Sequence, residues 1–365
     1  MQISFMLRGI HPNFGRKLKV QNTDDAIAHN LGNLVDKYIQ KFFLFAFSFT
    51  PHPRRVNKLS PKLKNANISS YALGSVGYID VATSKNMHVD QLLNQYAEGV
   101  RDFQEAALVG INLSGKDLRG IDLRRANLSY AILRGADLSS ANLREANLTH
   151  ADLSQATLVE SNLIAAGLNQ ANLYEADLSR AGLRGTKLIE ANLNRINLLE
   201  ANLGEVVMNK ANLQEANLCR ASLHRAKLMD ADLTRAILEG ANLSNAILTG
   251  AILEGANLVD VMAHGAILED SDLREADLSR AKLVGASLIH ANLGRISSRG
   301  INLSWASMRG ANLRRANLYR ANLSWANLSE ADLSEAVLVS ANINQANLHN
   351  ADLTGTIMPS GATHG

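Results

Sequence analysis

Cysteine is nearly absent from this chain of 365 residues, which contains a single one, Cys219. One thiol cannot form an intramolecular disulfide, so a disulfide-stapled scaffold is excluded and a reducing, cytoplasmic location is expected. Proline is scarce as well, and four of the five prolines lie near the N-terminus, the last of these four being Pro61. Aromatic residues make up only 5% of the chain, so any hydrophobic core must be built almost entirely from aliphatic side chains.

Long apolar runs and catalytic motifs are also missing. The run FFLFAFSF, Phe42 to Phe49, is far too short to cross a bilayer as a helix, although contact with a membrane surface stays open as an alternative. Phosphate-binding loops, nucleophile elbows and paired metal-ligand spacings do not occur, and the ten histidines are scattered. We therefore predict that the protein is not an enzyme and uses neither a cofactor nor a metal.

The chain has instead a period of five residues, which runs without interruption from residue 101 to 360. We number the five positions of each unit from its first residue, so that residues 101 to 105 are positions 1 to 5. Of the 52 units, 45 have Leu at position 3 and 39 have Ala at position 1. Five is neither the helical period nor the alternation of a simple strand. The pattern predicts short extended segments that turn a corner in every unit and keep positions 1 and 3 inside. Asn or Asp usually occupies position 2, where we expect the corner, because such side chains bond to nearby backbone.

Charges at position 5 predict how many units close one turn. Pairs of charged position-5 residues that are 20 apart comprise 14 of opposite sign and one of like sign. At a separation of 15, opposite signs occur in 3 pairs and like signs in 12. Facing strands favour opposite charges directly across from each other, so four units should make one coil. One such ladder is Glu175, Arg195, Glu215 and Arg235.

These units resemble the pentapeptide-repeat family, whose pattern is A-(D/N)-L-x-x. The resemblance covers residues 101–360 and is specific, because the register holds over 52 units. It implies an all-β solenoid, a right-handed quadrilateral parallel β-helix. With four units per coil, the repeats would form about 13 coils.

The flanking segments differ from the repeats. Residues 1–86 carry 12 Lys and Arg against 4 Asp and Glu, and we expect a poorly ordered or accessory segment whose best candidate helix spans residues 23–45. Residues 87–100 have apolar residues at helical spacing before Gly99, which predicts a short helix that caps the first coil. Met87 is therefore a candidate start of the working molecule. The segment 361–365 is expected to be a flexible tail, and end-to-end self-association at the last coil stays open.

One stretch of the repeats segregates charge. Between Asp277 and Glu330 the sequence has no acidic residue, and we predict a basic edge there. We interpret this edge first as a solvated polar surface, with a docking edge for an acidic partner as the alternative. Trp305 and Trp325 should fall near the opposite edge, so aromatic and basic groups do not interleave and no nucleic acid is expected. The edge comprises Arg280, Arg295, Arg299, Arg314, Arg315, Tyr319 and Arg320.

Two units depart from the core pattern at position 3, with Ala263 and Ser298, and both enlarge position 1, to Val261 and Ile296. An exchange of volume that keeps the core full explains both. As a whole the chain is predicted to be a non-catalytic rigid scaffold or interaction rod for an unknown protein partner. Two alternatives stay open: a membrane-surface protein, and a DNA-mimicking regulator of a topoisomerase, a role that the family resemblance brings in. The balanced charges of the repeats, 25 basic against 28 acidic, disfavour DNA mimicry.

Overall fold

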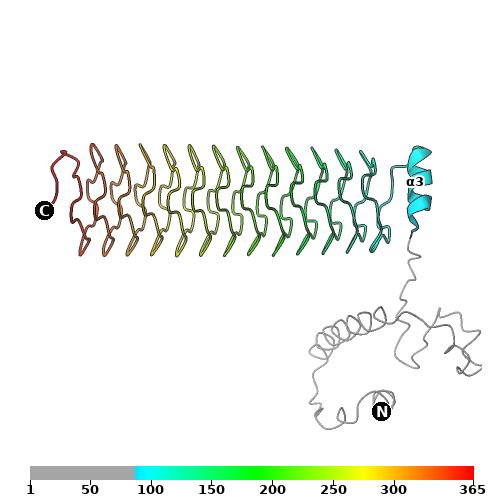
Figure 1. Ribbon diagram of the computed structural model, residues 1–365, viewed down its shortest axis with the longest axis horizontal. Helices are drawn as coiled ribbons and strands as arrows, with labels where there is room; N and C mark the ends of the chain where they lie inside the picture. Colours follow the sequence, from blue (N-terminus) through cyan, green and yellow to red (C-terminus); the bar gives the residue numbers. More distant parts are fainter. Residues whose placement is uncertain (1–86) are drawn as a thin grey trace, which may run out of the picture. The chain divides into compact units, whose positions relative to one another are not determined.

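The computed structural model describes residues 87–365, in which one α-helix is followed by a regular stack of coils (Figure 1). The basic segment 1–86, its expected helix at residues 23–45 and the run Phe42 to Phe49 lie outside the described residues, so these expectations stay predictions. None of the described helices has the length and apolar character that a membrane crossing would require.

Position 2 of each unit pairs with position 2 of the fourth unit after it. These bridges are parallel and continue from Asp102–Asp122 to Val337–Ile357. Four units separate the paired residues, so each coil has four sides, as the charge pattern predicted. Over residues 101–360 the ladders consist of single paired residues, because the chain turns again after every three extended residues. The coils therefore stack along one axis with corner above corner (Figure 1).

All five backbone N–H groups of a typical unit have a partner. In the unit 126–130, the N–H of position 1 closes a turn on position 3 of the preceding unit at 3.0 Å. The N–H of position 2 donates to the coil before at 2.9 Å, and those of positions 3 and 5 donate to the coil after at 2.7 and 3.0 Å. The remaining amide, Ser129 N–H, donates to Asn127 Oδ1 at 3.2 Å. Each coil is thus hydrogen-bonded to both of its neighbours, and no buried donor is lost.

The corners lie at positions 4 and 5, so the expectation that Asn and Asp occupy the corner is wrong. Position 5 has a positive φ in every unit except the last, for example 58° at Glu160 and 68° at Gly185. A positive φ at the second central residue is typical of a type II β-turn and favours glycine. Asn and Asp lie instead on the flat side and brace the corner from there, because their side-chain oxygen accepts the position-4 N–H.

The interior of the coils is filled by positions 1 and 3. Ala126 and Leu128 are both 0% exposed, and the same positions are buried in nearly all other units. At the two irregular units, Ala263 and Ser298 are buried next to equally buried larger residues at position 1. The Ser298 hydroxyl donates to the Asn317 carbonyl oxygen at 2.7 Å, which provides the hydrogen bond that a buried hydroxyl requires.

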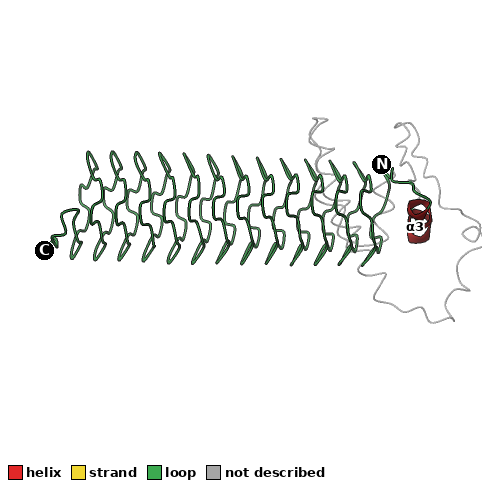
Figure 2. Cartoon of the chain, turned by 90° about the horizontal axis from the view of Figure 1, so that it is seen from above, coloured by secondary structure: helices red, strands yellow, loops and turns green. Residues whose placement is uncertain are grey.

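The helix α3 (Val89–Ala97) precedes the first coil and lies against it (Figures 1 and 2). Leu92 at its centre is fully buried in the same core as the repeat leucines. Two hydrogen bonds tie this end to the coils: Met87 N–H donates to the Ala107 carbonyl at 3.1 Å, and the Tyr96 hydroxyl donates to the Arg119 carbonyl at 2.9 Å. The helix therefore shares its apolar face with the first coil.

At the other end, the last residues fold back onto the final coil. Thr363 pairs with Ile357 in an antiparallel bridge. Met358 N–H donates to the Ala362 carbonyl at 2.8 Å, and Gly355 N–H donates to the carbonyl of His364 at 3.0 Å. The segment 361–365, expected to be a flexible tail, is thus placed along one side of the coil, where it supplies acceptors that a following coil would otherwise provide.

Candidate functional site

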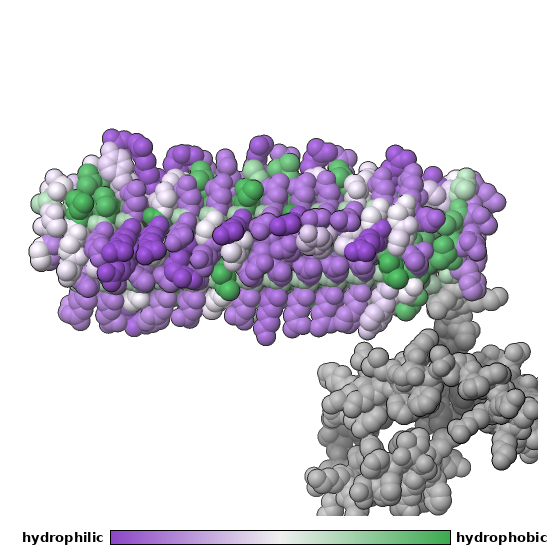
Figure 3. All heavy atoms as spheres, in the orientation of Figure 1, coloured by the Kyte–Doolittle hydropathy of each residue, from purple (hydrophilic) through white to green (hydrophobic). Residues whose placement is uncertain are grey.

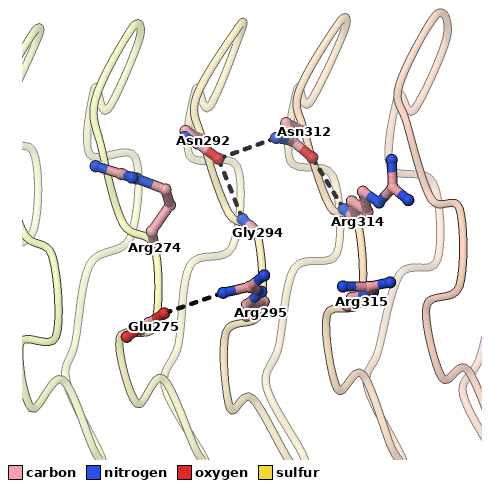
Figure 4. Close-up of a pocket in the computed structure, with 8 residues that line it drawn as sticks. All are labelled: Arg274, Glu275, Asn292, Gly294, Arg295, Asn312, Arg314 and Arg315. Atoms are coloured by element: carbon pink, nitrogen blue, oxygen red, sulfur yellow. Dashed lines mark hydrogen bonds and ion pairs between the residues drawn. The ribbon is translucent and has the colours of Figure 1, made fainter.

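The surface of the coils is mainly polar, with apolar groups scattered singly over the visible face (Figure 3). A hollow of about 260 Å³ lies where the basic edge was predicted. Gly294 occupies position 4 there, between Arg274 one coil before and Arg314 one coil after (Figure 4). The hollow, called the notch from here on, exists because glycine contributes no side chain at a position where its ladder neighbours carry long ones. Its lining is Arg274, Glu275, Asn292, Gly294, Arg295, Asn312, Arg314 and Arg315.

Asparagine side chains hold the backbone around this notch. Asn312 Nδ2 donates to Asn292 Oδ1 at 3.1 Å, and the same oxygen accepts Gly294 N–H at 3.3 Å. Arg314 N–H donates to Asn312 Oδ1 at 3.0 Å (Figure 4). The floor of the notch is therefore a hydrogen-bonded surface. Arg274 and Arg314 flank it, and their guanidiniums are directed away from Gly294, to Glu254 and to Glu335 (Figure 4).

The arginines of the notch meet carboxylates from neighbouring coils. Arg315 and Arg314 both contact Glu335, at 2.7 and 2.8 Å. These guanidiniums, Arg315 first, hold the pKa of the Glu335 carboxyl below its usual value. Arg295 lies 3.5 Å from Glu275, a weaker contact. The three edge arginines that line the notch are thus each paired with a carboxylate from an adjacent coil, and Arg314 and Arg315 share one.

The other predicted edge residues divide into two groups. Arg280 forms a bidentate ion pair with Asp260, in which Nε donates to Oδ1 at 2.8 Å. This contact lowers the pKa of the Asp260 carboxyl. Arg299 and Arg320 instead flank the ring of Tyr319, with guanidinium carbons 5.3 and 5.1 Å from its centroid. Neither of these two arginines has a carboxylate within 4.0 Å among residues 87–365.

Two tryptophans form the most exposed aromatic surface of the described coils. Trp305 and Trp325 occupy position 5 in successive coils and stack with centroids 5.0 Å apart and ring planes 3° from parallel. They are 62% and 52% exposed. The sequence already indicated this stack, since the two residues are 20 apart, but their place relative to Tyr319 needed the course of the chain around the coil.

Sequence reasoning missed Arg274 and Gly294 as parts of the notch. The signal that could have found them is the ladder at a separation of 20, which places Arg274, Gly294 and Arg314 in one row. A second, smaller hollow of about 90 Å³ lies near the first coils, with a lining of Gln104, Arg124, Arg125, Arg144 and Glu145. Within residues 87–365 no three His, Cys, Asp or Glu side chains are grouped so as to hold a metal ion.

Comparisons with known proteins agree with the repeat pattern. The model of the family "Pentapeptide repeats" matches residues 102–295 and 299–358. No curated protein sequence matches the chain. Among solved structures, HetL from the cyanobacterium Nostoc sp. strain PCC 7120, a pentapeptide repeat protein involved in heterocyst differentiation regulation, is 35% identical; the match covers 76% of this chain and 100% of HetL, with a TM-score of 0.23.

Two further solved structures differ more from the chain in sequence. QnrB1, a plasmid-mediated fluoroquinolone resistance protein, is 16% identical over 53% of this chain and 90% of its own, with a TM-score of 0.36. A pentapeptide repeat protein of the Arabidopsis thaliana thylakoid lumen is 27% identical over 33% of this chain and 71% of its own, with a TM-score of 0.21. With the family model matched over most of the repeats, this chain belongs to the pentapeptide-repeat family, whose members fold as right-handed quadrilateral β-helices and are generally not enzymes.

Proposed function

We propose that the protein is a non-catalytic, rigid rod that binds another protein, and that an acidic segment of this partner docks at the notch arginines Arg295, Arg314 and Arg315. The observation that carries the proposal is the filled interior together with the arginine-lined hollow around Gly294. Leucine and alanine leave no internal room for a substrate, so recognition has to take place on the outside. The outer surface is long, regular and rigid, which suits a binding scaffold.

The rod itself is inferred to consist of 13 coils, roughly 60 Å long at the spacing of paired strands. We propose that α3 acts as its N-terminal cap, because Leu92 covers apolar surface on the first coil that would otherwise be open to pairing. The opposite end keeps its last apolar side chains, such as Leu348, only partly buried, which supports end-to-end association of two copies. We also propose a cytoplasmic location, which rests on the scarcity of cysteine.

An acidic partner is favoured over nucleic acid at the notch because carboxylates already orient the guanidiniums of the notch arginines. Glu335 contacts two arginines at once, so an incoming carboxylate can replace it or share those donors in the same planar geometry. DNA mimicry needs an acidic surface, whereas the ladders here alternate in sign, as in the contacts of Arg195 with Glu175 and Glu215.

Binding of a fluorescent decaglutamate peptide to the full chain, measured by anisotropy, tests the proposal. The triple change R295Q/R314Q/R315Q should weaken binding about tenfold, since charge-assisted contacts are lost. A matched control is R180Q/R195Q/R220Q, which removes three other exposed arginines, each paired with a glutamate of an adjacent coil. Equal weakening in the two triple variants would contradict a docking site at the notch.

A further inference from the structure

Arg299 and Arg320, which have no carboxylate partner among residues 87–365, border the same side of the coil as the exposed tryptophans. The chain turns a corner at Tyr319–Arg320, crosses the side formed by residues 321–323 and turns again at Ser324–Trp325. One coil earlier, residues 299–305 take the same course. We call the surface formed by residues 279–285, 299–305, 319–325 and 339–345 the aromatic–basic side. The expectation that aromatic and basic groups lie apart therefore holds for the notch arginines but not for Arg299 and Arg320.

This side contains no acidic residue. Its four segments read SRAKLVG, RGINLSW, YRANLSW and VSANINQ, with four basic residues. Arg280 is paired with Asp260 on the preceding coil, whereas Lys282, Arg299 and Arg320 have no carboxylate within 4.0 Å among residues 87–365. The surface is thus complementary to an anionic ligand.

Between the two corners the surface is flat and rich in amide groups. Asn322 Nδ2 donates to Asn302 Oδ1 at 3.2 Å, and Asn342 Nδ2 donates to Asn322 Oδ1 at 3.3 Å. Such a ladder offers no bulky obstruction. Three extended residues span about 10 Å, a distance that a peptide of a few residues can cross.

Beside the two stacked tryptophans there is a space with no side chain, which we call the vacant step. Position 5 in the coil before Trp305 is Gly285, and apart from its two chain neighbours no described residue has an atom within 4 Å of where its Cβ would be. Adjacent coils are about 4.8 Å apart, which lies within the range of about 4.5–7 Å between the centroids of paired aromatic rings, so one flat ring fits against the face of Trp305 above Gly285. No ring fits between Trp305 and Trp325, because their centroids are only 5.0 Å apart.

We propose that the aromatic–basic side binds a short segment of a partner polypeptide in which one aromatic residue is flanked by acidic residues. The aromatic ring stacks on Trp305 in the vacant step, and the acidic side chains reach Arg299, Arg320 and Lys282. A peptide is favoured over single-stranded nucleic acid because, among residues 87–365, the side offers a stacking face beside Gly285 and three cations with no carboxylate within 4.0 Å, whereas strand binding relies on repeated stacking along a basic groove. The inference rests on the proposed role as a protein-binding rod, but on a surface separate from the notch.

Tryptophan fluorescence is a direct probe, because Trp305 and Trp325 are the only tryptophans of the chain. The probe ligand is a peptide with one phenylalanine between two pairs of glutamates, titrated into the full chain. We expect a saturable change in emission. Replacing the phenylalanine by alanine, or the glutamates by glutamine, should weaken binding about tenfold or more, since a stacked ring and charge-assisted contacts are each worth about that factor.

Blocking the vacant step tests the geometry. Gly285→Gln should abolish the fluorescence response because its side chain occupies the space beside Trp305. Glutamine is tolerated at this positive φ, as at Gln155 and Gln170. The matched control Gly185→Gln fills an equally open position 5 in a distant coil and should bind like the wild type.

Charge variants separate this inference from the proposed function. R299Q/R320Q should weaken the binding that tryptophan emission reports about tenfold, whereas R180Q/R195Q/R220Q, in earlier coils and outside both proposed surfaces, should leave it unchanged. The inference is overturned if the peptide leaves the emission unchanged, if Gly285→Gln responds like the wild type, or if oligothymidylate binds more tightly than the peptide. A failed decaglutamate test with an intact fluorescence response would instead reject the notch alone.

Discussion

At the scale of single residues, the leucine at position 3 is buried because the coils stack on one another. Because every repeat position recurs one coil later, each position-3 side chain lies between equivalent side chains of the coils before and after. Leu348 in the coil of residues 341–360 is only partly buried, whereas Leu218 in the middle is 0% exposed. The same residue type at the same repeat position thus has different packing at the two places.

Leu218→Ala should lower the free energy of unfolding by about 2–5 kcal/mol, since it removes buried methyl groups and leaves a cavity. Leu348→Ala is the matched control and should cost clearly less, because its site is open to solvent. Urea denaturation followed by circular dichroism measures both. A loss below about 1 kcal/mol at Leu218 would show that position 3 does not face inward.

The carboxyl of Glu335 gives a second test at this scale. Its pKa lies below the usual 4.5 because Arg315, and after it Arg314, bond to the charged form. Stability from these contacts is therefore present above about pH 4.5 and is lost as the pH falls through the lower folded pKa. R315Q should raise the Glu335 pKa in an NMR titration, whereas R180Q, at a distant corner, should leave it unchanged. An unaltered Glu335 pKa in R315Q would contradict the ion pair.

At the scale of the element, the repeating unit is a three-residue extended segment plus a two-residue corner. The corner places position 5 in the left-handed region, where residues other than glycine are strained. The chain nevertheless has a charged or polar residue at most of these positions, as at Glu200 and Arg220, which form an ion pair at 3.1 Å. At Arg220 the N–H of the strained residue donates to the Glu239 carbonyl at 2.9 Å, and the next N–H, of Ala221, closes the turn on Leu218 at 3.0 Å. Such bonds hold the strained residues in place.

Two glycines three positions apart separate the effect of φ from that of packing. Gly185→Ala should destabilise the protein by about 1 kcal/mol, because φ is +68° and its Cβ would meet nothing. Gly182→Ala should stabilise it by about 0.4–1 kcal/mol, because φ is not positive and the nearest atoms lie 3.9 Å from the new Cβ. Thermal unfolding compares the two. The same sign for both would contradict the assigned corner.

At the scale of the whole molecule, the two ends of the coil stack differ. The N-terminal end is covered by α3, which contributes the buried Leu92 and hydrogen bonds from Met87 and Tyr96. At the C-terminal end, residues 361–365 fold back and form hydrogen bonds with only one side of the last coil. The two ends of the stack thus present different surfaces: α3 at one end, and partly buried apolar side chains such as Leu348 at the other.

Removing α3 should expose the core around Phe103 and cause self-association. A chain that begins at Arg101 should therefore form larger species in light scattering after size exclusion, because unpaired edges and apolar surface are uncovered. A chain that begins at Met87 is the matched control: it should stay in the state of the full chain and melt within a few degrees of it. Identical behaviour of both shortened chains would reject a capping role for α3.

The period, the inward positions and the four-unit coil could be predicted from the sequence, because each rests on local chemistry repeated many times. Leu and Ala alternate with polar residues inside every unit, and charges 20 apart alternate in sign, as at Glu175 and Arg195. Even the family could be recognised from these letters alone. Part of the corner signal was overlooked, since glycine occupies position 5 in 13 units and marks the positive φ there.

Tertiary structure decided which surface groups meet. The stretch without acids looked strongly basic in the sequence, yet Glu335 and Asp260 reach its arginines from neighbouring coils. Within the part of the chain that the structure describes, the same folding left Arg299 and Arg320 with no carboxylate within 4.0 Å and brought them to the side that Trp325 borders. The physical reason is that a charge is neutralised by whatever lies within a few ångströms, and in a coil of four units most of those neighbours are distant in the sequence.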